Sequence, residues 1–72
     1  MSAMREQLDR LVDEMVSKGI RFEDAQREFE KRFIAHVLTK VEGNLCKAAD
    51  VLGIHRNTLS RKLTEFRLRR SA

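Results

Sequence analysis

Three glycines divide this chain into four segments, and the chain contains no proline. Glycine weakens a helix and proline interrupts one, so the stretches between Gly19, Gly43 and Gly53 are free to be helical. These stretches are rich in leucine, glutamate, lysine and arginine, all of which favour the helix. We therefore predict an all-α fold of four helices.

The first segment has the apolar spacing of an amphipathic helix. Gly19 suits the C-terminal cap of this helix, and Lys18 is favourably placed near the negative end of the helix dipole. The first helix is thus expected to end at Lys18. Its apolar stripe follows the spacing i, i+3, i+4, i+7 and consists of Leu8, Leu11, Val12 and Met15.

The second segment, residues 22–41, begins with Glu23 and Asp24, which are acids suited to the first turn of a helix. Its apolar residues spread over a wider arc than one neighbouring helix covers, so a second chain is the best explanation. His36 lies among them and is expected to be partly buried. The apolar residues are Phe22, Ala25, Phe29, Phe33, Ile34, Val37, Leu38 and Val41.

The size of the chain also indicates a partner. A domain of 72 residues buries only about 60% of its unfolded surface, so a monomer is marginally stable. Cys46 is the only cysteine, which excludes an intrachain disulfide, and His36 and His55 leave too few ligands for zinc. We predict a homodimer without metal or cofactor. The expected dimer residues are Leu8, Leu11, Val12, Met15, Phe22, Phe29 and Phe33.

Charge is distributed unevenly between the two halves. Residues 1–42 carry eight Lys/Arg and nine Asp/Glu, a net charge of −1, whereas residues 43–72 carry seven and two, a net charge of +5. This asymmetry indicates an anionic polymer or surface as partner of the C-terminal half. No apolar run approaches the roughly 18 residues of a membrane span, and acids replace the apolar core of a signal peptide, so a cytoplasmic protein without membrane contact is expected.

The C-terminal half has the pattern of a helix-turn-helix. Asn44 is a good N-cap for a short helix over residues 45–52, Gly53 ends that helix, and a fourth helix follows over residues 55–66. Ile54 between them is expected to be buried. Ala48 and Ala49 are small residues, which are expected where another helix packs closely against this one. On the fourth helix, Leu59, Leu63 and Phe66 face inward and Asn57, Arg61 and Thr64 outward.

The outward residues suit DNA. Arginine pairs with guanine and asparagine with adenine in the major groove, so Arg61 and Asn57 are candidates for base reading. His55, Arg56 and Thr58 lie near the helix N-terminus, where they suit a base or a phosphate. The residues expected to meet the flanking backbone are Asn44 and Lys47, and those expected to add sequence-independent charge are Lys62, Arg67, Arg69 and Arg70.

The stretch "GNLCKAADVLGIHRNTLSRKL" closely resembles the helix-turn-helix of the Fis family, which also forms the C-terminal DNA-binding domain of NtrC-type activators. The shared pattern is G-N, A-A, L-G-I, R, T-L and K-L. "FEDAQREFEKRFIAHVL" is similar to the preceding helix of the NtrC-type domains, and the resemblance extends from Phe22 to about Leu68. It implies one domain over residues 1–72, in which residues 1–42 intertwine with a second copy and residues 43–72 form the helix-turn-helix and a basic tail.

The resemblance also implies a homodimer that bends double-stranded DNA and compresses the minor groove between its two recognition helices. Such a protein acts in bacterial transcription or nucleoid organisation, and RNA polymerase or other regulators are candidate partners. The contact positions that the resemblance implies are Asn44, Cys46, Lys47, His55, Arg56, Thr58, Ser60 and Arg61.

Some positions depart from the family pattern. Ser60 and Glu65 stand where Fis is basic, and Cys46 and His55 replace other polar residues, so fewer phosphate contacts and a different target site are expected. The chain is too short at its N-terminus for the mobile hairpin of Fis. Met1 favours a free-standing protein, and a DNA-binding fragment of an NtrC-type activator is the alternative.

Catalysis and protein docking are the two alternatives to DNA binding. No nucleophile with a nearby base, carboxylate pair or phosphate-binding loop is visible in the sequence, so an enzyme is not expected. A small helical adaptor that docks another protein on its apolar arc is the less favoured alternative. Cys46 in the first turn of a helix also allows a redox switch on the DNA-binding face.

Overall fold

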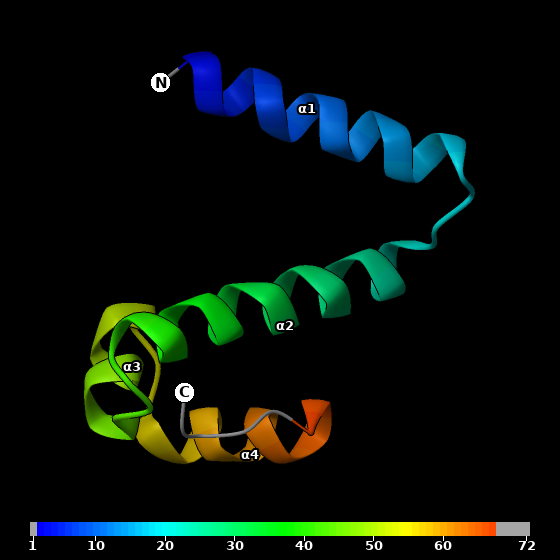
Figure 1. The fold of residues 1–72 in the computed structure, drawn as a ribbon. Helices are drawn as coiled ribbons and strands as arrows, with labels where there is room; N and C mark the ends of the chain where they lie inside the picture. The colour runs from blue at the N-terminus through cyan, green and yellow to red at the C-terminus, as the bar shows by residue number, and fades with distance from the viewer. Residues whose placement is uncertain (1, 68–72) are drawn as a thin grey trace.

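The computed structural model describes residues 2–67, which form four α-helices and no strand (Figure 1). The helices are α1 (Ser2–Ser17), α2 (Phe22–Lys40), α3 (Leu45–Leu52) and α4 (Arg56–Phe66). The prediction of an all-α fold with four helices is confirmed, and each boundary lies within one residue of its predicted place. In the described range, no helix is both long and apolar enough to cross a bilayer. The tail from Leu68 onward, with Arg69 and Arg70, lies outside the described residues.

The hydrophobic core lies among the last three helices. Ala48 and Leu59 are completely buried. The burial of Ala48 explains why α3 has a small residue at the point where it meets its neighbours. Each helix contributes one stripe to the core at helical spacing, so burial follows directly from the sequence pattern. The core residues are Ile34, Val37 and Leu38 of α2, Leu45, Ala48 and Ala49 of α3, and Leu59, Leu63 and Phe66 of α4.

The turn between α3 and α4 is closed by a Schellman motif. The N–H of Ile54 donates to the carbonyl of Ala49 at 3.1 Å, and the N–H of Gly53 donates to that of Asp50 at 3.2 Å. Gly53 has φ of +71°, in the left-handed region that a side chain disfavours. Ile54 packs against the core but is only partly buried, less than predicted. This motif sets the direction in which the chain enters α4.

Gly53→Ala is expected to lower the free energy of unfolding by about 1 kcal/mol, because alanine in the left-handed region is strained. Within residues 2–67, no atom beyond the adjoining residues lies within 4 Å of the position that the added Cβ would occupy, so the expected cost is conformational strain. Chemical denaturation followed by circular dichroism measures the change. Gly53→Asn is the matched control and should lose less, since asparagine tolerates this conformation better; equal stability of wild type and Gly53→Ala would contradict the prediction.

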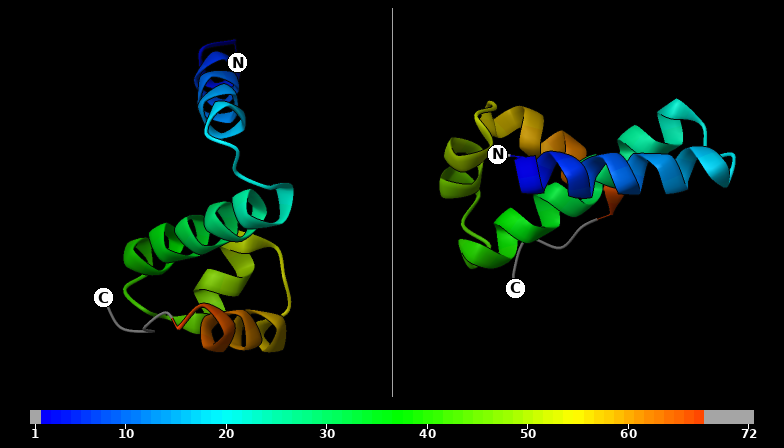
Figure 2. Two further views of the ribbon diagram at one scale, coloured as in Figure 1. Left: turned by 90° about the vertical axis from the view of Figure 1, so that its right-hand side faces the viewer. Right: turned by 90° about the horizontal axis from the view of Figure 1, so that it is seen from above.

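Helix α1 stands apart from the other three helices. Figure 2 shows it above them in the left-hand view, joined to α2 by the segment that contains Gly19. None of its residues is buried. Leu8, Leu11 and Val12 are each about half exposed, at 50%, 52% and 47%. Of the predicted stripe, Met15 is partly buried beside a hollow that Asp24 and Glu28 of α2 also line, and the other three residues are exposed.

The N-terminal part of α2 is similarly uncovered. The side chains of Phe22, Phe29 and Phe33 are 80%, 57% and 51% exposed. His36, predicted to be partly buried, is exposed, and its Nδ1 lies 3.3 Å from the carbonyl oxygen of Arg32. That prediction was wrong because His36 lies on the side of α2 that α3 and α4 leave open, whereas Val37 and Leu38 face the core.

Candidate nucleic-acid interface

Helix α4 has one buried face and one exposed face, as the sequence pattern predicts. Leu59, Leu63 and Phe66 are buried against α2 and α3. Asn57 and Arg61, four residues apart, are exposed, and so is Thr64, whose hydroxyl donates to the Ser60 carbonyl at 3.2 Å. The buried leucines thus hold the helix while the polar side chains project from it.

His55 precedes α4 and caps it. Its backbone is extended, with φ of −69° and ψ of 144°, and its Nδ1 accepts a hydrogen bond from the N–H of Asn57 at 3.1 Å. The predicted start of this helix at His55 is one residue too early. Because Nδ1 is the acceptor, the proton of the neutral ring lies on Nε2. The Nε2–H of His55 is therefore an exposed hydrogen-bond donor at the N-terminus of α4.

His55→Ala is expected to destabilise the protein by about 1 kcal/mol, because the N–H of Asn57 loses its acceptor. His55→Asn keeps an acceptor of a type preferred at this position and should match the wild type or exceed it. Thermal unfolding followed by circular dichroism distinguishes the two variants. Equal loss of stability in both would show that the cap contributes nothing and that the ring acts in another way.

The start of α3 carries a second set of polar groups. The side-chain oxygen of Asn44 accepts from the N–H of Lys47 at 3.1 Å, which confirms Asn44 as the N-cap. Cys46 and Lys47 are exposed in the first turn that follows. The N-termini of α3 and α4 therefore both present exposed polar side chains, and the positive end of each helix dipole favours anions there.

The basic residues of these two sites are not neutralised by the protein. Of the carboxylates in residues 2–67, none lies within ion-pair distance of Lys47, Arg56 or Arg61. All three side chains are exposed. Their charges are available to a polyanion, and no internal pair has to be broken first.

Three of the ten predicted contact residues are less accessible than the others. Thr58 and Ser60 are half-buried on the flanks of α4, as expected from their angular positions. Lys62 is also half-buried, and its Nζ lies 2.7 Å from Oε1 of Glu30 on α2. The structure thus brings seven exposed residues to the starts of α3 and α4 and along the outer face of α4, and it places Lys62 against the protein. They are Asn44, Cys46, Lys47, His55, Arg56, Asn57 and Arg61.

The sequence model of a family described as "Bacterial regulatory protein, Fis family" matches residues 25–66, which include most of α2 and all of α3 and α4. A putative Fis-like DNA-binding protein of Xylella fastidiosa (strain Temecula1) is 50% identical over 42 residues, which are 58% of this chain and 47% of the relative. The chain therefore spans about half the length of that relative.

Two longer regulators also match. The DNA-binding transcriptional regulator NtrC of Azospirillum brasilense is 39% identical over 54 residues, and that of Rhizobium meliloti is 36% identical over 63 residues. These matches cover 75% and 88% of the chain but only 11% and 13% of the relatives. No solved structure gives a significant match. Because the family match covers more than half of the chain, including the whole helix-turn-helix, this protein belongs to the Fis family of bacterial regulatory proteins.

Proposed function

We propose that this protein is a homodimeric double-stranded DNA-binding protein of bacterial transcription regulation, with α4 in the major groove. The observation that carries the proposal is the outer face of α4, where exposed Asn57 and Arg61 stand on a helix anchored by buried leucines. An α-helix fits the major groove, and these two side chains have the donor geometry for adenine and guanine. The names of the Fis-like and NtrC relatives agree with this function.

The other polar groups have positional roles in this proposal. Arg56, Thr58 and the Nε2–H of His55 contact a base or a phosphate near the start of α4, and Ser60 contacts the strand from its flank. Asn44, Cys46 and Lys47 meet the flanking phosphates at the start of α3. Phosphate contacts fix the register of the protein on the duplex, and base contacts carry the sequence preference.

A second copy of the chain covers the apolar surfaces that the monomer leaves open. The rings of Phe29 and Phe33 lie 5.5 Å apart at 49° to one another and form a ridge on α2. Hollows of about 310 and 440 Å³ adjoin this ridge; residues of α2 and α3 line both, and Ile54 and Lys62 also line the smaller one. Surface of this kind marks a protein interface. The stripe of α1, which comprises Leu8, Leu11, Val12 and Met15, joins Phe22, Phe29 and Phe33 in the interface.

The dimer presents two copies of α4 to one duplex. Two reading helices closer together than one helical turn of DNA require the duplex to bend, so part of the sequence preference comes from DNA deformability. Such a protein works in the cytoplasm on the nucleoid, as a transcription regulator or an organiser of DNA. RNA polymerase and other regulators are its proposed protein partners.

The alternative is that the chain is the DNA-binding part of an NtrC-type activator. The extent of the matches favours it, because the NtrC proteins align over 75% and 88% of the chain, compared with 58% for the Fis-like relative. The proposed chemistry of α3 and α4 is the same in both cases. In the alternative, the domains of the longer protein supply the regulation.

Selection from a library of randomised DNA with the purified chain tests the proposed function. We expect enrichment of sites with two-fold symmetry, and binding that weakens steeply as salt increases because phosphate contacts release counterions. Circular-permutation gel shifts on the enriched duplex measure the bend. If no sequence is enriched and no salt-dependent binding is seen, the proposal is wrong and the adaptor hypothesis gains weight. Light scattering of the same sample measures the number of chains.

A further inference from the structure

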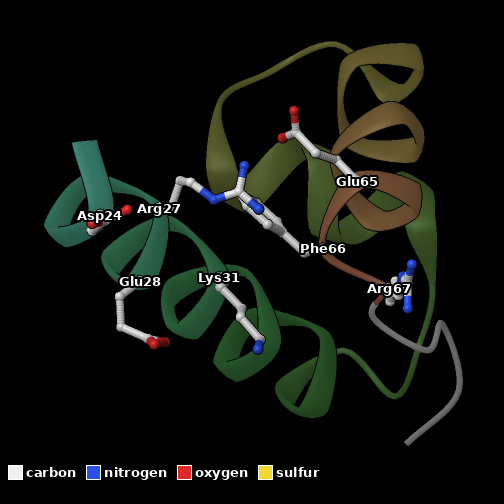
Figure 3. A pocket seen from close by; sticks show the side chains of 7 residues that line it. All are labelled: Asp24, Arg27, Glu28, Lys31, Glu65, Phe66 and Arg67. Atoms are coloured by element: carbon white, nitrogen blue, oxygen red, sulfur yellow. The ribbon is translucent and has the colours of Figure 1, made fainter.

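Two side-chain contacts connect α4 directly to α2. Nζ of Lys62 lies 2.7 Å from Oε1 of Glu30, and the guanidinium carbon of Arg27 lies 5.6 Å from the ring centroid of Phe66. Figure 3 shows Arg27 reaching from α2 across the Phe66 ring, while Glu28 points away from α4. Helix α4 crosses α2 at a wide angle, as the right-hand view of Figure 2 shows. The two contacts therefore bridge helices that are distant in sequence.

The spacing of the four residues makes the two contacts act together. Arg27 and Glu30 are three residues apart on α2, and Lys62 and Phe66 are four apart on α4, so each pair lies on one helix face. The contacts are thus about one turn apart along both helices. One contact alone allows a helix to pivot, whereas two contacts separated by a turn restrain both its tilt and its rotation about its own axis.

The rotation of α4 decides where its reading residues point. Arg61 and Lys62 are neighbours, so their side chains are about 100° apart around the helix. Any rotation that moves Lys62 away from Glu30 swings the guanidinium of Arg61 by the same angle. A side chain that hydrogen-bonds to a base must be held within roughly 0.5 Å and 10–20° of the productive geometry. Fixing Lys62 therefore helps to fix the geometry of base reading.

The surroundings of the Glu30–Lys62 pair distinguish it from the other ion pairs. Its side chains are only 30% and 32% exposed, beside the hollow that Phe29 and Phe33 line. The Glu28–Arg32 pair, by contrast, joins residues of one helix at 3.6 Å with side chains 45% and 78% exposed. Partial burial reduces screening by water and salt, so the attraction between Lys62 and Glu30 is stronger than that of a fully exposed pair.

We propose that Glu30 is a positioning residue for DNA recognition, which holds Lys62 and so fixes the orientation of α4, and that Lys62 neutralises Glu30 instead of a DNA phosphate. The proposal rests on the proposed function, in which α4 enters the major groove. It replaces the sequence-based expectation that Lys62 contacts DNA. It also gives Glu30, a residue on the helix outside the helix-turn-helix, a part in sequence preference.

The first test is Glu30→Gln in the full chain, with affinity measured for the library-selected duplex and for a scrambled duplex of equal length. The substitution keeps the size of the side chain and adds one positive charge, so affinity for the scrambled duplex should hold or rise. Affinity for the selected duplex should fall about tenfold, because α4 loses its orientation. Loss of folding would instead lower both affinities. A ratio of the two affinities within about threefold of wild type would overturn the proposal.

Glu28→Gln is the matched control, since it makes the same charge change on the same helix at a residue that does not contact α4. We expect both affinities to change together and their ratio to remain at the wild-type value. A fall in the ratio equal to that of Glu30→Gln would show that net charge, and not position, controls preference. That result would also overturn the proposal.

Reversal of the pair gives an independent test that does not depend on one variant folding. Glu30→Lys with Lys62→Glu restores an ion pair at unchanged net charge, and it should recover preference to within about threefold of wild type, whereas each single reversal loses it. If Lys62 instead contacts phosphate, the double reversal places a carboxylate against DNA and binds poorly. Failure of the double reversal to improve on the single variants would thus reject the proposal.

The salt dependence of Lys62→Met separates the two roles of this lysine. A lost phosphate contact lowers the slope of log affinity against log salt by about 0.9 for each copy, and we expect no change in slope. A fall of that size would reject the proposal while leaving the proposed function intact. If the wild-type chain shows no preference for any duplex, the proposed function itself fails. The two failures are therefore distinguishable.

Discussion

Replacing both Arg56 and Arg61 with alanine should weaken binding to the selected duplex at least about a hundredfold. Each arginine contributes roughly 1–3 kcal/mol through base or phosphate contacts, and both copies in a dimer lose them. Both side chains are exposed and neither pairs with a carboxylate among residues 2–67, so the protein itself should lose little stability. Gel shifts or fluorescence anisotropy at fixed salt measure the affinity, and circular dichroism checks the fold.

The matched control is Arg10→Ala with Lys31→Ala, which removes the same charge from exposed positions on α1 and α2. A general electrostatic effect would weaken binding by a similar factor in both double variants. A local effect at α4 would leave the control close to the wild type. Unchanged affinity of the Arg56 and Arg61 variant would show that α4 is not the reading helix.

The two arginines can be separated by sequence preference. Arg61 lies on the outer face of α4, so Arg61→Ala should relax the preference at one base pair of each half-site. If Arg56 contacts phosphate, Arg56→Ala should weaken binding to all sequences equally and lower the salt slope. A repeated library selection with each single variant tests this division. Loss of preference at a base pair in the Arg56→Ala selection would assign Arg56 to base reading as well.

The local part of this fold could be predicted from the sequence because its signals are local. Gly19 and Gly53 marked helix ends, and the period of the leucines identified Leu59, Leu63 and Phe66 as the inner face of α4. Once one face of a helix is assigned to the core, the outward position of Arg61 follows from geometry. Asn44 could likewise be predicted as an N-cap, because the hydrogen bond that it accepts comes from Lys47, only three residues away.

Contacts between helices could not be predicted in this way. Glu30 and Lys62 are 32 residues apart, and their meeting depends on the angle at which α4 crosses α2. That angle is set by the Schellman turn at Gly53 and by the packing of Ala48, not by any pattern around Glu30 or Lys62. The Arg27–Phe66 contact depends on the same angle. The exposure of His36 also depends on which part of α2 the other two helices cover.

Phe33→Glu should abolish the proposed dimer, with the dimer dissociation constant raised at least about a hundredfold. A phenylalanine transferred from water into an interface contributes roughly 1.5–3 kcal/mol, and a buried carboxylate without a partner costs several more. The ring of Phe33 is 51% exposed in the single chain and lies outside its core, so each monomer should keep the packing of α2, α3 and α4. Sedimentation or light scattering over a range of concentrations measures the dissociation.

Loss of the dimer should carry over to DNA binding, because two linked half-site contacts become two independent ones. The Phe33→Glu monomer is therefore expected to bind a single half-site weakly while its α4 remains intact. Thr39→Glu is the matched control, since it adds the same charge to an exposed position of α2 whose hydroxyl donates to the carbonyl of Ala35 on the same helix. A Phe33→Glu variant that remained dimeric and bound the full site like the wild type would place the dimer interface elsewhere, and the exposed ridge of Phe29 and Phe33 would then require a different partner.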